Sequence, residues 1–203
     1  MKARLLISGH PDFPGPNALE AFVRAHARGG LTIRDADMFA RTMKEGVIVA
    51  IIDDDNALIA MSAILPLEHG EFEMGAALVR GDMTGFSLQR YMIAARLAAA
   101  AERSLVAPEK LYAGALQSDA GAGSRAMIEI NGFSPIDFDE VPKILQDECL
   151  TCTKTAHRPD GERCCYKYYR ACGRRPESAA LPARVELTNR RDGRVLTLVL
   201  SHP

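Results

Sequence analysis

The chain has 203 residues, of which 47% are hydrophobic and 25% are charged, and its formal net charge is -1. A chain of this length and composition can bury a sizeable core, which excludes a disordered protein and predicts one large globular domain, or one domain with an appendage. The small net charge also excludes a global field that would draw the protein onto nucleic acid or a membrane, so such a partner would need a local patch.

The apolar run Leu5–Ile7 is too short for a signal sequence or a membrane span, and no later run is long enough. We therefore expect a soluble, cytoplasmic protein. All five cysteines lie between Cys149 and Cys172. An odd number of cysteines in a reducing compartment argues against a disulfide framework and favours metal binding, catalysis or inert thiols.

The first predicted elements are a strand and two helices. Residues 4–8 form the strand, and the Pro- and Gly-rich HPDFPGP after it is a loop. Asn17 and Glu20 have the spacing of a capping box, which predicts that a helix begins here. A second, short helix contains Met38 and Phe39 and ends at Gly46.

Three antiparallel strands follow. The apolar runs GVIVAIID and ALIAMSAIL meet at the polar residues 53–56, three aspartates and Asn56, which predicts a hairpin with an exposed turn. A third strand covers 71–79, and a long helix begins near Phe86. The remaining pattern predicts, in order, a strand in KLYAGAL, a short helix in GAGSRAMIEIN and a strand in GFSPI.

This order of elements, with the segments EMGAALVRGDMTGFSLQRYMIAARLAAAA and SRAMIEINGFSP, resembles the GNAT acyltransferase superfamily. The resemblance covers residues 1–138. It implies an α/β (α+β) fold with a mixed, mostly antiparallel central sheet flanked by helices. It also implies that the protein is an enzyme, which transfers an acetyl or other acyl group from acyl-CoA to an amine by direct attack.

In the family, a loop written [Q/R]-x-x-G-x-[G/A] binds the pyrophosphate of acetyl-CoA with backbone N–H groups at the start of the following helix. The matching segment here is DMTGFS, which keeps Gly85 but has Asp82 in place of the basic or amide residue. Arg80 is expected to supply the missing charge. The resemblance thus gives a coenzyme site that contains Val79, Arg80, Thr84, Gly85, Phe86 and Ser87. The alternative is an ordinary helix-initiating loop with Gly85 as turn and Thr84 as cap.

Family members usually carry a tyrosine that protonates the coenzyme A thiolate, four residues before a Gly-Phe pair. The corresponding residue is Ile128, which cannot donate a proton. Tyr166, Tyr168 or Tyr169 could substitute, and we select Tyr168 as the candidate.

For the general base the candidates are Glu73 and then Glu71, because alternation along the strand places both on one face, and several family members carry a base there. The alternative is that these carboxylates are simply solvated at the end of the strand.

The cysteines follow the predicted sixth strand. We expect the aromatic run CCYKYYRA to be the seventh strand and the residues before it to be an insertion. The Cys149-x2-Cys152 spacing is that of half a zinc site. We predict a structural zinc site with the ligands Cys149, Cys152, Cys164 and Cys172, and Cys165 in the core. His157 or Cys165 are alternative fourth ligands, and redox-active, catalytic or inert thiols are alternative roles.

After a polar linker, ARVELT and RVLTLVL flank the turn residues 189–193, which predicts a C-terminal hairpin. The hairpin could extend the sheet, cover its edge or form a homodimer contact. The predicted segments are therefore 1–138, the acyltransferase core, 139–175, the cysteine-rich insertion with the last core strand, and 176–203, the hairpin.

Two other functions compete with acyl transfer. Residues 153–175 hold seven Lys or Arg against two acids, and Tyr166, Tyr168 and Tyr169 could stack on bases, so the chain could bind or modify nucleic acid. A catalytically silent interaction module is the third hypothesis, because Ile128 and the loop depart from the family pattern. For the enzyme, the expected partner is a small-molecule or peptide amine, and no membrane.

Overall fold

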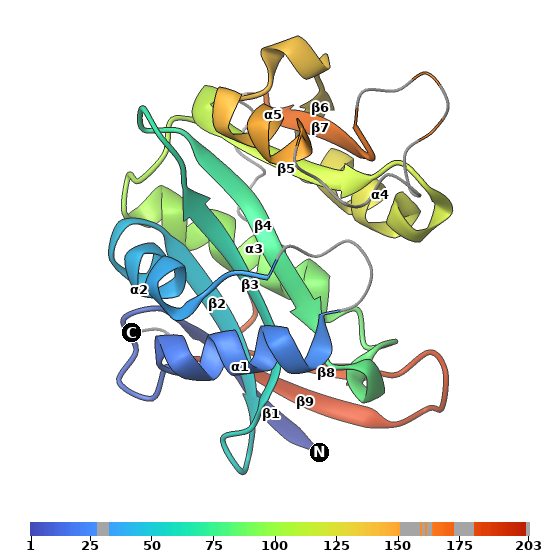
Figure 1. The fold of residues 1–203 in the computed structure, drawn as a ribbon. Helices are drawn as coiled ribbons and strands as arrows, with labels where there is room; N and C mark the ends of the chain where they lie inside the picture. The colour runs from blue at the N-terminus through green and yellow to red at the C-terminus, as the bar shows by residue number, and fades with distance from the viewer. Residues whose placement is uncertain (28–32, 151–158, 160, 162–163, 173–180, 202–203) are drawn as a thin grey trace. The chain divides into compact units, whose positions relative to one another are not determined.

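The computed structural model describes residues 1–27, 33–150, 159, 161, 164–172 and 181–201. The chain forms two compact units. The first contains Met1–Leu65, Ala76–Leu105 and Ser178–Pro203, and the second contains Pro66–Gly75 and Val106–Glu177. Strand β4, Phe72–Val79, begins in the second unit and ends in the first. Figure 1 shows the path of the chain.

The sheet of the first unit has the strand order β4-β3-β2-β1-β9-β8. Its other strands are β1 Lys2–Ile7, β2 Val47–Asp53, β3 Leu58–Pro66, β8 Arg184–Thr188 and β9 Val195–Leu200. Strands β1, β2 and β3 pair in antiparallel order, as predicted. Nearly all side chains of β2 and β3 are buried, which explains why both read as continuous apolar runs and not as alternating ones.

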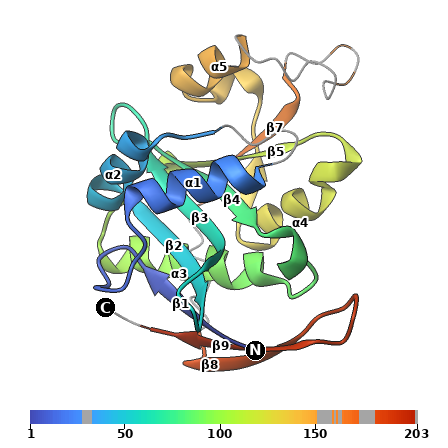
Figure 2. The same ribbon diagram turned by 60° about the horizontal axis from the view of Figure 1, so that its bottom comes forward.

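Helices cover both faces of this sheet (Figure 2). On one face lie α1, Pro16–His26, and α2, Ala36–Glu45, with Phe22 and Phe39 packed against Met61. On the other face lies α3, Leu88–Glu102, which contacts β1 and β2. The predicted end of α2 at Gly46 is confirmed, because Gly46 is its C-cap and a side chain there would collide with the carbonyl oxygen of Ile64.

The capping box predicted for α1 is wrong. The N-cap is Gly15, with Pro16 at the first helical position, and no side chain caps the helix. Proline is favoured there because its fixed φ suits the first turn and its missing N–H needs no partner. Glu20 instead accepts hydrogen bonds from Arg24 and from the backbone N–H of Ala36.

The C-terminal hairpin is confirmed. Strands β8 and β9 pair in antiparallel order, with Val185 opposite Leu198 and Leu187 opposite Leu196. Strand β9 also pairs with β1 in parallel, through residues such as Leu198 and Ala3. Of the three placements considered for the hairpin, the structure therefore shows the one that extends the sheet.

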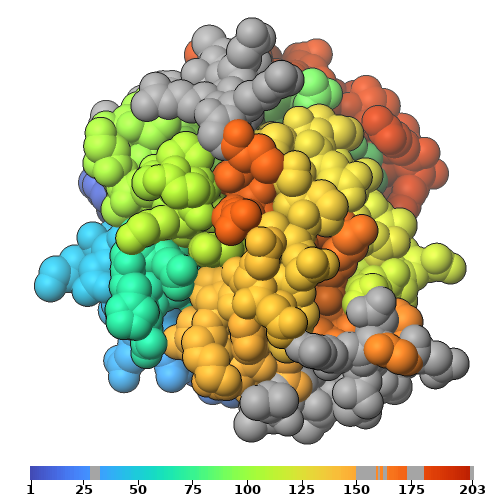
Figure 3. Space-filling view, turned by 90° about the horizontal axis from the view of Figure 1, so that it is seen from above, coloured from blue at the N-terminus to red at the C-terminus, as the bar shows by residue number. Residues whose placement is uncertain are grey.

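In the second unit the strand order is β6-β7-β5-β4. Its elements are β5 Leu111–Leu116, α4 Ala122–Ile130, β6 Phe133–Pro135, α5 Lys143–Leu150 and β7 Tyr166–Ala171. Strand β7 lies between β5 and β6 and is antiparallel to both, which confirms the seventh strand predicted from the aromatic run. Figure 3 shows α5 and the residues before it at the surface, in amber.

Four short 3₁₀ helices complete the described elements: η1 Gly81–Met83, η2 Pro108–Lys110, η3 Asp119–Gly121 and η4 Phe138–Glu140. The predicted α/β fold class is confirmed, because the strands form a mixed, mostly antiparallel sheet flanked by helices. The cysteine-rich insertion stays a prediction. Within the described residues, no helix is both long enough and apolar enough to cross a bilayer.

The burial of β9 makes a prediction about stability. Leu198 has no exposed surface, whereas Val195 on the same strand is 49% exposed. We expect Leu198→Ala to lower the free energy of unfolding by about 2–5 kcal/mol, because it leaves a cavity in the core. We expect Val195→Ala to change it by less than about 0.5 kcal/mol. Urea unfolding followed by circular dichroism measures both, and equal effects would contradict the packing of β9.

Candidate functional site

The loop between β4 and α3 turns the chain through two left-handed residues. After η1 the backbone reaches Gly85 at φ 100° and Ser87 at φ 58°. Ser87 is the N-cap of α3, and its side chain makes no capping hydrogen bond. The N–H groups of the first helical turn therefore lack a side-chain cap, and they carry the positive end of the helix dipole.

Thr84 does not act as the cap of α3, so that part of the ordinary-loop alternative is wrong. Its hydroxyl donates a hydrogen bond to the carbonyl oxygen of Gly81, at the opposite end of η1, at 2.8 Å. Thr84 thus stabilises the 3₁₀ turn and does not cap α3.

Arg80 does not simply supply the charge that the loop was expected to lack. Its guanidinium makes two hydrogen bonds to the Asp82 carboxylate, at 2.7 and 3.1 Å. The same guanidinium lowers the pKa of Asp82 below its usual range. The two charges of this pair therefore largely cancel within the loop.

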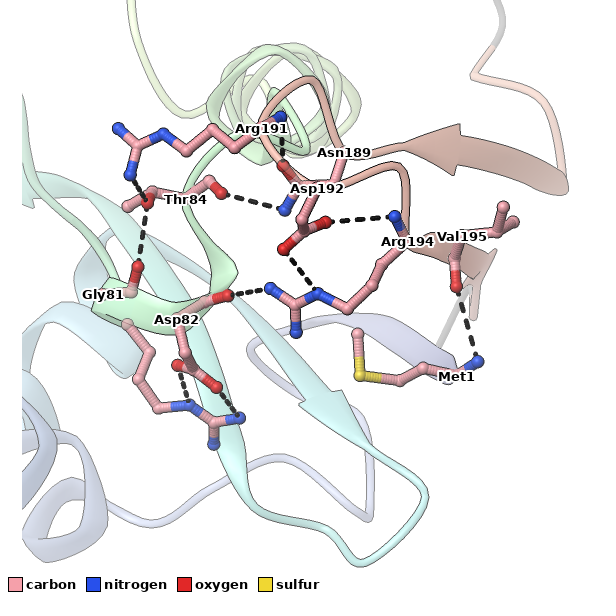
Figure 4. A network of polar contacts seen from close by, with 10 residues as sticks. Met1, Gly81, Asp82, Thr84, Asn189, Arg191, Asp192, Arg194 and Val195 are labelled. Carbon is pink, nitrogen blue, oxygen red and sulfur yellow. Dashed lines mark hydrogen bonds and ion pairs between the residues drawn. The ribbon is translucent and has the colours of Figure 1, made fainter.

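The turn of the C-terminal hairpin packs directly on this loop (Figure 4). The Asn189 side chain donates to the carbonyl oxygen of Thr84 at 3.1 Å and accepts from the backbone N–H of Arg191 at 2.8 Å. The backbone N–H of Arg190 donates to the carbonyl oxygen of Gly85. Arg191 Nη1 also donates to Thr84 Oγ1 at 2.7 Å. Only 2% of Asn189 is exposed, so this junction is buried at its centre.

A second arginine of the turn holds the other end of the loop. Arg194 Nη2 donates to the backbone oxygen of Asp82 at 2.7 Å, and Nε of the same guanidinium donates to Asp192. Its guanidinium also lies 5.7 Å from the centre of the buried Phe86 ring. Sequence reasoning missed these contacts, because the turn sequence shows charged residues and a hairpin but not what the hairpin lies against.

The two candidate bases lie on one face, as alternation predicted. Phe72 and Met74 are buried, whereas Glu71 and Glu73 are half-buried. Glu71 stands just before β4 and accepts a hydrogen bond from the Tyr112 hydroxyl at 3.4 Å.

The Glu73 carboxylate lies over Gly75, where a Cβ would approach its Cδ to 3.2 Å. The next residue, Ala76, has φ 48°, so the regular pleat of β4 is interrupted here. The pairing of β4 with β5 covers only Phe72–Met74 and Leu111–Ala113. Glu73 is therefore the last carboxylate before the strand changes conformation.

Tyr168 is buried with two thiols. Its hydroxyl lies 3.4 Å from Sγ of Cys149, which is also hydrogen-bonded to Cys164. Burial raises the pKa of Tyr168, and Cys149, Cys164 and the negative charge of Glu73 raise it further. Tyr168 therefore holds its proton at neutral pH, which makes it a weak acid but a permanent hydrogen-bond donor.

The other tyrosines and Ile128 fit less well as acids. Tyr169 has no exposed surface, and burial together with a hydrogen bond to Glu129 raises its pKa to about 12. Tyr166 is half-buried, with its ring 6.2 Å from that of Tyr168. Ile128 is buried on α4, so its position contributes packing.

The predicted zinc ligands are only partly brought together. Cys149 and Cys164 are in contact, and Cys165 is buried in the same cluster. Cys172 follows the far end of β7, and a six-residue strand spans roughly 20 Å, so it cannot share an ion with Cys164. Cys152 and His157 lie outside the described residues. Among the residues that are described, no three His, Cys, Asp or Glu are placed to hold a metal ion.

The thiol pair has unequal pKa values. The hydrogen bond from the Cys149 thiol lowers the pKa of Cys164, and the same bond raises the pKa of Cys149. Of the two thiols, Cys164 lines a cavity of about 500 Å³ in the second unit, together with Phe138, Tyr166 and Tyr168. The lining joins apolar and polar side chains, as ligand pockets do.

The nucleic-acid hypothesis loses part of its support. Much of 153–175 lies outside the described residues, but Tyr168 is 7% exposed and Tyr169 not at all. A ring must be accessible to stack on a base. Two of the three predicted stacking residues therefore do not serve that role in this conformation.

No protein-family model and no curated protein sequence matches this chain. Solved structures do match its fold. A GNAT-family acetyltransferase from Staphylococcus aureus Mu50 is 12% identical, with a TM-score of 0.52, over 82% of this chain and 98% of the other. A chimeric spermidine N-acetyltransferase from Vibrio cholerae and hSSAT is 10% identical, with a TM-score of 0.53, over 83% and 95%. The chain therefore has the GNAT fold.

Gly85 provides a test of the loop geometry. A side chain at this position would require an L-residue at φ 100° and would collide with the Asn189 side chain. We expect Gly85→Ala to lower the free energy of unfolding by at least about 1–2 kcal/mol. Gly81 in the same loop is the matched control, because a Cβ there meets nothing within 4 Å. If thermal unfolding shows Gly81→Ala to be as harmful as Gly85→Ala, the loop has a different conformation.

Proposed function

We propose that this protein is an N-acyltransferase that binds acyl-CoA at Val79–Ser87 and transfers the acyl group to an amine. The observation that carries the proposal is the uncapped N-terminus of α3, which follows a left-handed turn at Gly85 and Ser87. Helix N-termini of this kind bind phosphate groups through their N–H groups. The GNAT fold, which acetyltransferases share, supports the same function.

The loop sets the position of the coenzyme. Glycine at 85 lets the backbone turn, and Ser87 in the left-handed conformation starts α3 without a capping hydrogen bond from its side chain. A pyrophosphate would receive hydrogen bonds from these groups and lie at the positive end of the helix dipole. Acetyl-CoA or another acyl-CoA is therefore the proposed cosubstrate.

The proposed transfer step is direct attack of the amine on the thioester. Glu73, on the strand that leads into the loop, takes a proton from the ammonium form of the acceptor, directly or through water. The amine nitrogen then forms a bond to the carbonyl carbon, the carbon–sulfur bond breaks, and the second proton of the nitrogen passes to solvent or to the released thiolate. The coenzyme leaves as a thiolate, and Tyr168 is the candidate donor of a hydrogen bond to the departing sulfur.

A catalytically silent GNAT-fold module remains the second candidate. Two observations favour it: the buried Ile128 at the usual acid position, and the ion pair that cancels the charge of Arg80. The two hypotheses differ in coenzyme binding, because an interaction module does not need acyl-CoA.

Coenzyme binding is the test that separates them. We expect acetyl-CoA at 100 times its dissociation constant to stabilise the protein by about 2.7 kcal/mol, measured as a thermal unfolding shift. Metal content is determined first, so that metal loss does not mimic instability. The stabilisation should persist in Gly81→Ala and vanish in Gly85→Ala. No shift with acetyl-CoA, longer acyl-CoA or free coenzyme A in the wild-type protein would refute the enzyme.

Polyamines, amino acids and peptides are first screened for an amine that the wild-type protein acetylates. The role of Glu73 is then tested with that amine. We expect Glu73→Gln to lower kcat/KM about 100-fold or more, because the amide cannot accept a proton. Chromatography of the acetylated product measures it, and the dissociation constant of acetyl-CoA should not change. Glu71→Gln is the matched control. A larger loss in Glu71→Gln would transfer the role to that residue.

A further inference from the structure

We propose that the turn of the C-terminal hairpin, Asn189–Arg194, is the second half of the coenzyme site: Asn189 fixes the loop, and the Arg191 guanidinium binds a coenzyme phosphate. This inference rests on the proposed function. It adds a cationic contact that the loop sequence lacks and assigns it to a segment outside residues 1–138, the part of the chain that carries the resemblance.

Asn189 is a positioning residue. Both ends of its buried amide are used, the nitrogen on Thr84 of the loop and the oxygen on Arg191 of the turn. Its backbone closes the turn, since its N–H donates to Arg194 and its carbonyl oxygen accepts from Gly193. One side chain therefore fixes two backbone segments that are far apart in the sequence, since Asn189 and Thr84 are separated by 105 residues.

Arg191 is held at the loop by one nitrogen of its guanidinium, and its other N–H groups are not directed at Thr84. Its guanidinium uses Nη1 on Thr84 Oγ1, and a guanidinium has five N–H groups in all. Thr84 in turn donates to Gly81, so the hydroxyl that receives Arg191 is itself fixed. In Figure 4 the Arg191 guanidinium lies beside the Thr84 side chain. Arg191 is exposed, and the donors not directed at Thr84 are therefore accessible to a ligand.

The balance of charge singles out this residue. Arg80 is paired with Asp82, and Arg194 is paired with Asp192. Among the described residues, no carboxylate pairs with Arg191. A guanidinium that no described carboxylate neutralises, held on Thr84 in the loop that leads into α3, attracts an anionic group such as a phosphate, and its fork geometry matches two phosphate oxygens.

The chemistry of the ligand follows from this arrangement. Coenzyme A carries a pyrophosphate and a 3′-phosphate, and both present the oxygens that a guanidinium binds. Because Arg191 contacts Thr84 in the loop that leads into α3, we assign it to the pyrophosphate. The 3′-phosphate is the other source of the same chemistry, and the experiment separates the two.

The experiment measures dissociation constants by isothermal titration calorimetry for coenzyme A, 3′-dephospho-coenzyme A and pantetheine, with competition where binding is weak. The variants are Arg191→Ala and Arg191→Lys. Arg184→Ala is the matched control, because Arg184 is an exposed arginine of the same hairpin that pairs with Glu186. All are surface changes, and thermal unfolding without ligand verifies that each variant is folded.

We expect Arg191→Ala to weaken binding of both coenzyme A and dephospho-coenzyme A about tenfold, which equals about 1.4 kcal/mol. Binding of pantetheine, which has no phosphate group, should change less than about twofold. Arg191→Lys should recover part of the loss, since it keeps the charge but not the fork. Arg184→Ala should match the wild-type protein. A loss confined to coenzyme A would support the phosphate contact and move it to the 3′-phosphate.

Three results would overturn the proposal. Wild-type affinity in Arg191→Ala would show that the guanidinium binds no phosphate, and the proposed acyltransferase would stand without it. An equal loss of affinity for pantetheine would show that Arg191 only supports the structure. An equal loss of coenzyme affinity in Arg184→Ala would show that any positive charge on the hairpin has the same effect. Absence of coenzyme binding in the wild-type protein is a separate result, because it refutes the proposed function itself.

Discussion

The buried amide of Asn189 is the contact on which the geometry of the loop depends. It joins the loop before α3 to the turn between β8 and β9, and Gly85 has no side chain that would occupy the same space. A buried amide with both ends satisfied contributes stability, whereas one unsatisfied end would cost about 1–3 kcal/mol. The left-handed turn that opens the N-terminus of α3 is therefore supported from outside the loop, by a segment at the other end of the chain.

Strand β4 carries the second constraint. Its first half has Phe72 and Met74 buried on either side of the half-buried Glu73, and its second half leads to the loop. The change occurs at Ala76, whose left-handed φ is unusual for a residue other than glycine. Such a conformation persists only where the surrounding structure enforces it, and it occurs often at functional sites.

The spacing of the cysteines in the sequence predicted part of their arrangement in the structure. Cys149 and Cys164 do come together, and Cys165 lies in the core, as the pattern predicted. Cys172 does not join them, because the aromatic run between Cys165 and Cys172 is an extended strand, which separates its two ends. The same strand buries Tyr168 and Tyr169, which sequence reasoning also considered as exposed stacking residues. The zinc site stays a prediction, since Cys152 and His157 lie outside the described residues.

The sequence by itself determined the order of the strands and of the helices before them, though not helix α5, because local apolar spacing, glycines and turn residues act over a few neighbours. It placed the strands around the turn at 53–56, the end of α2 at Gly46, strand β7 and the C-terminal hairpin. It also located the loop at Gly85 through a resemblance. Only the tertiary structure decided that Arg80 pairs with Asp82 and that Asn189 and Arg191 lie on the loop. Contacts between residues about a hundred positions apart depend on how β9 pairs with β1, and no local pattern in the sequence encodes that pairing.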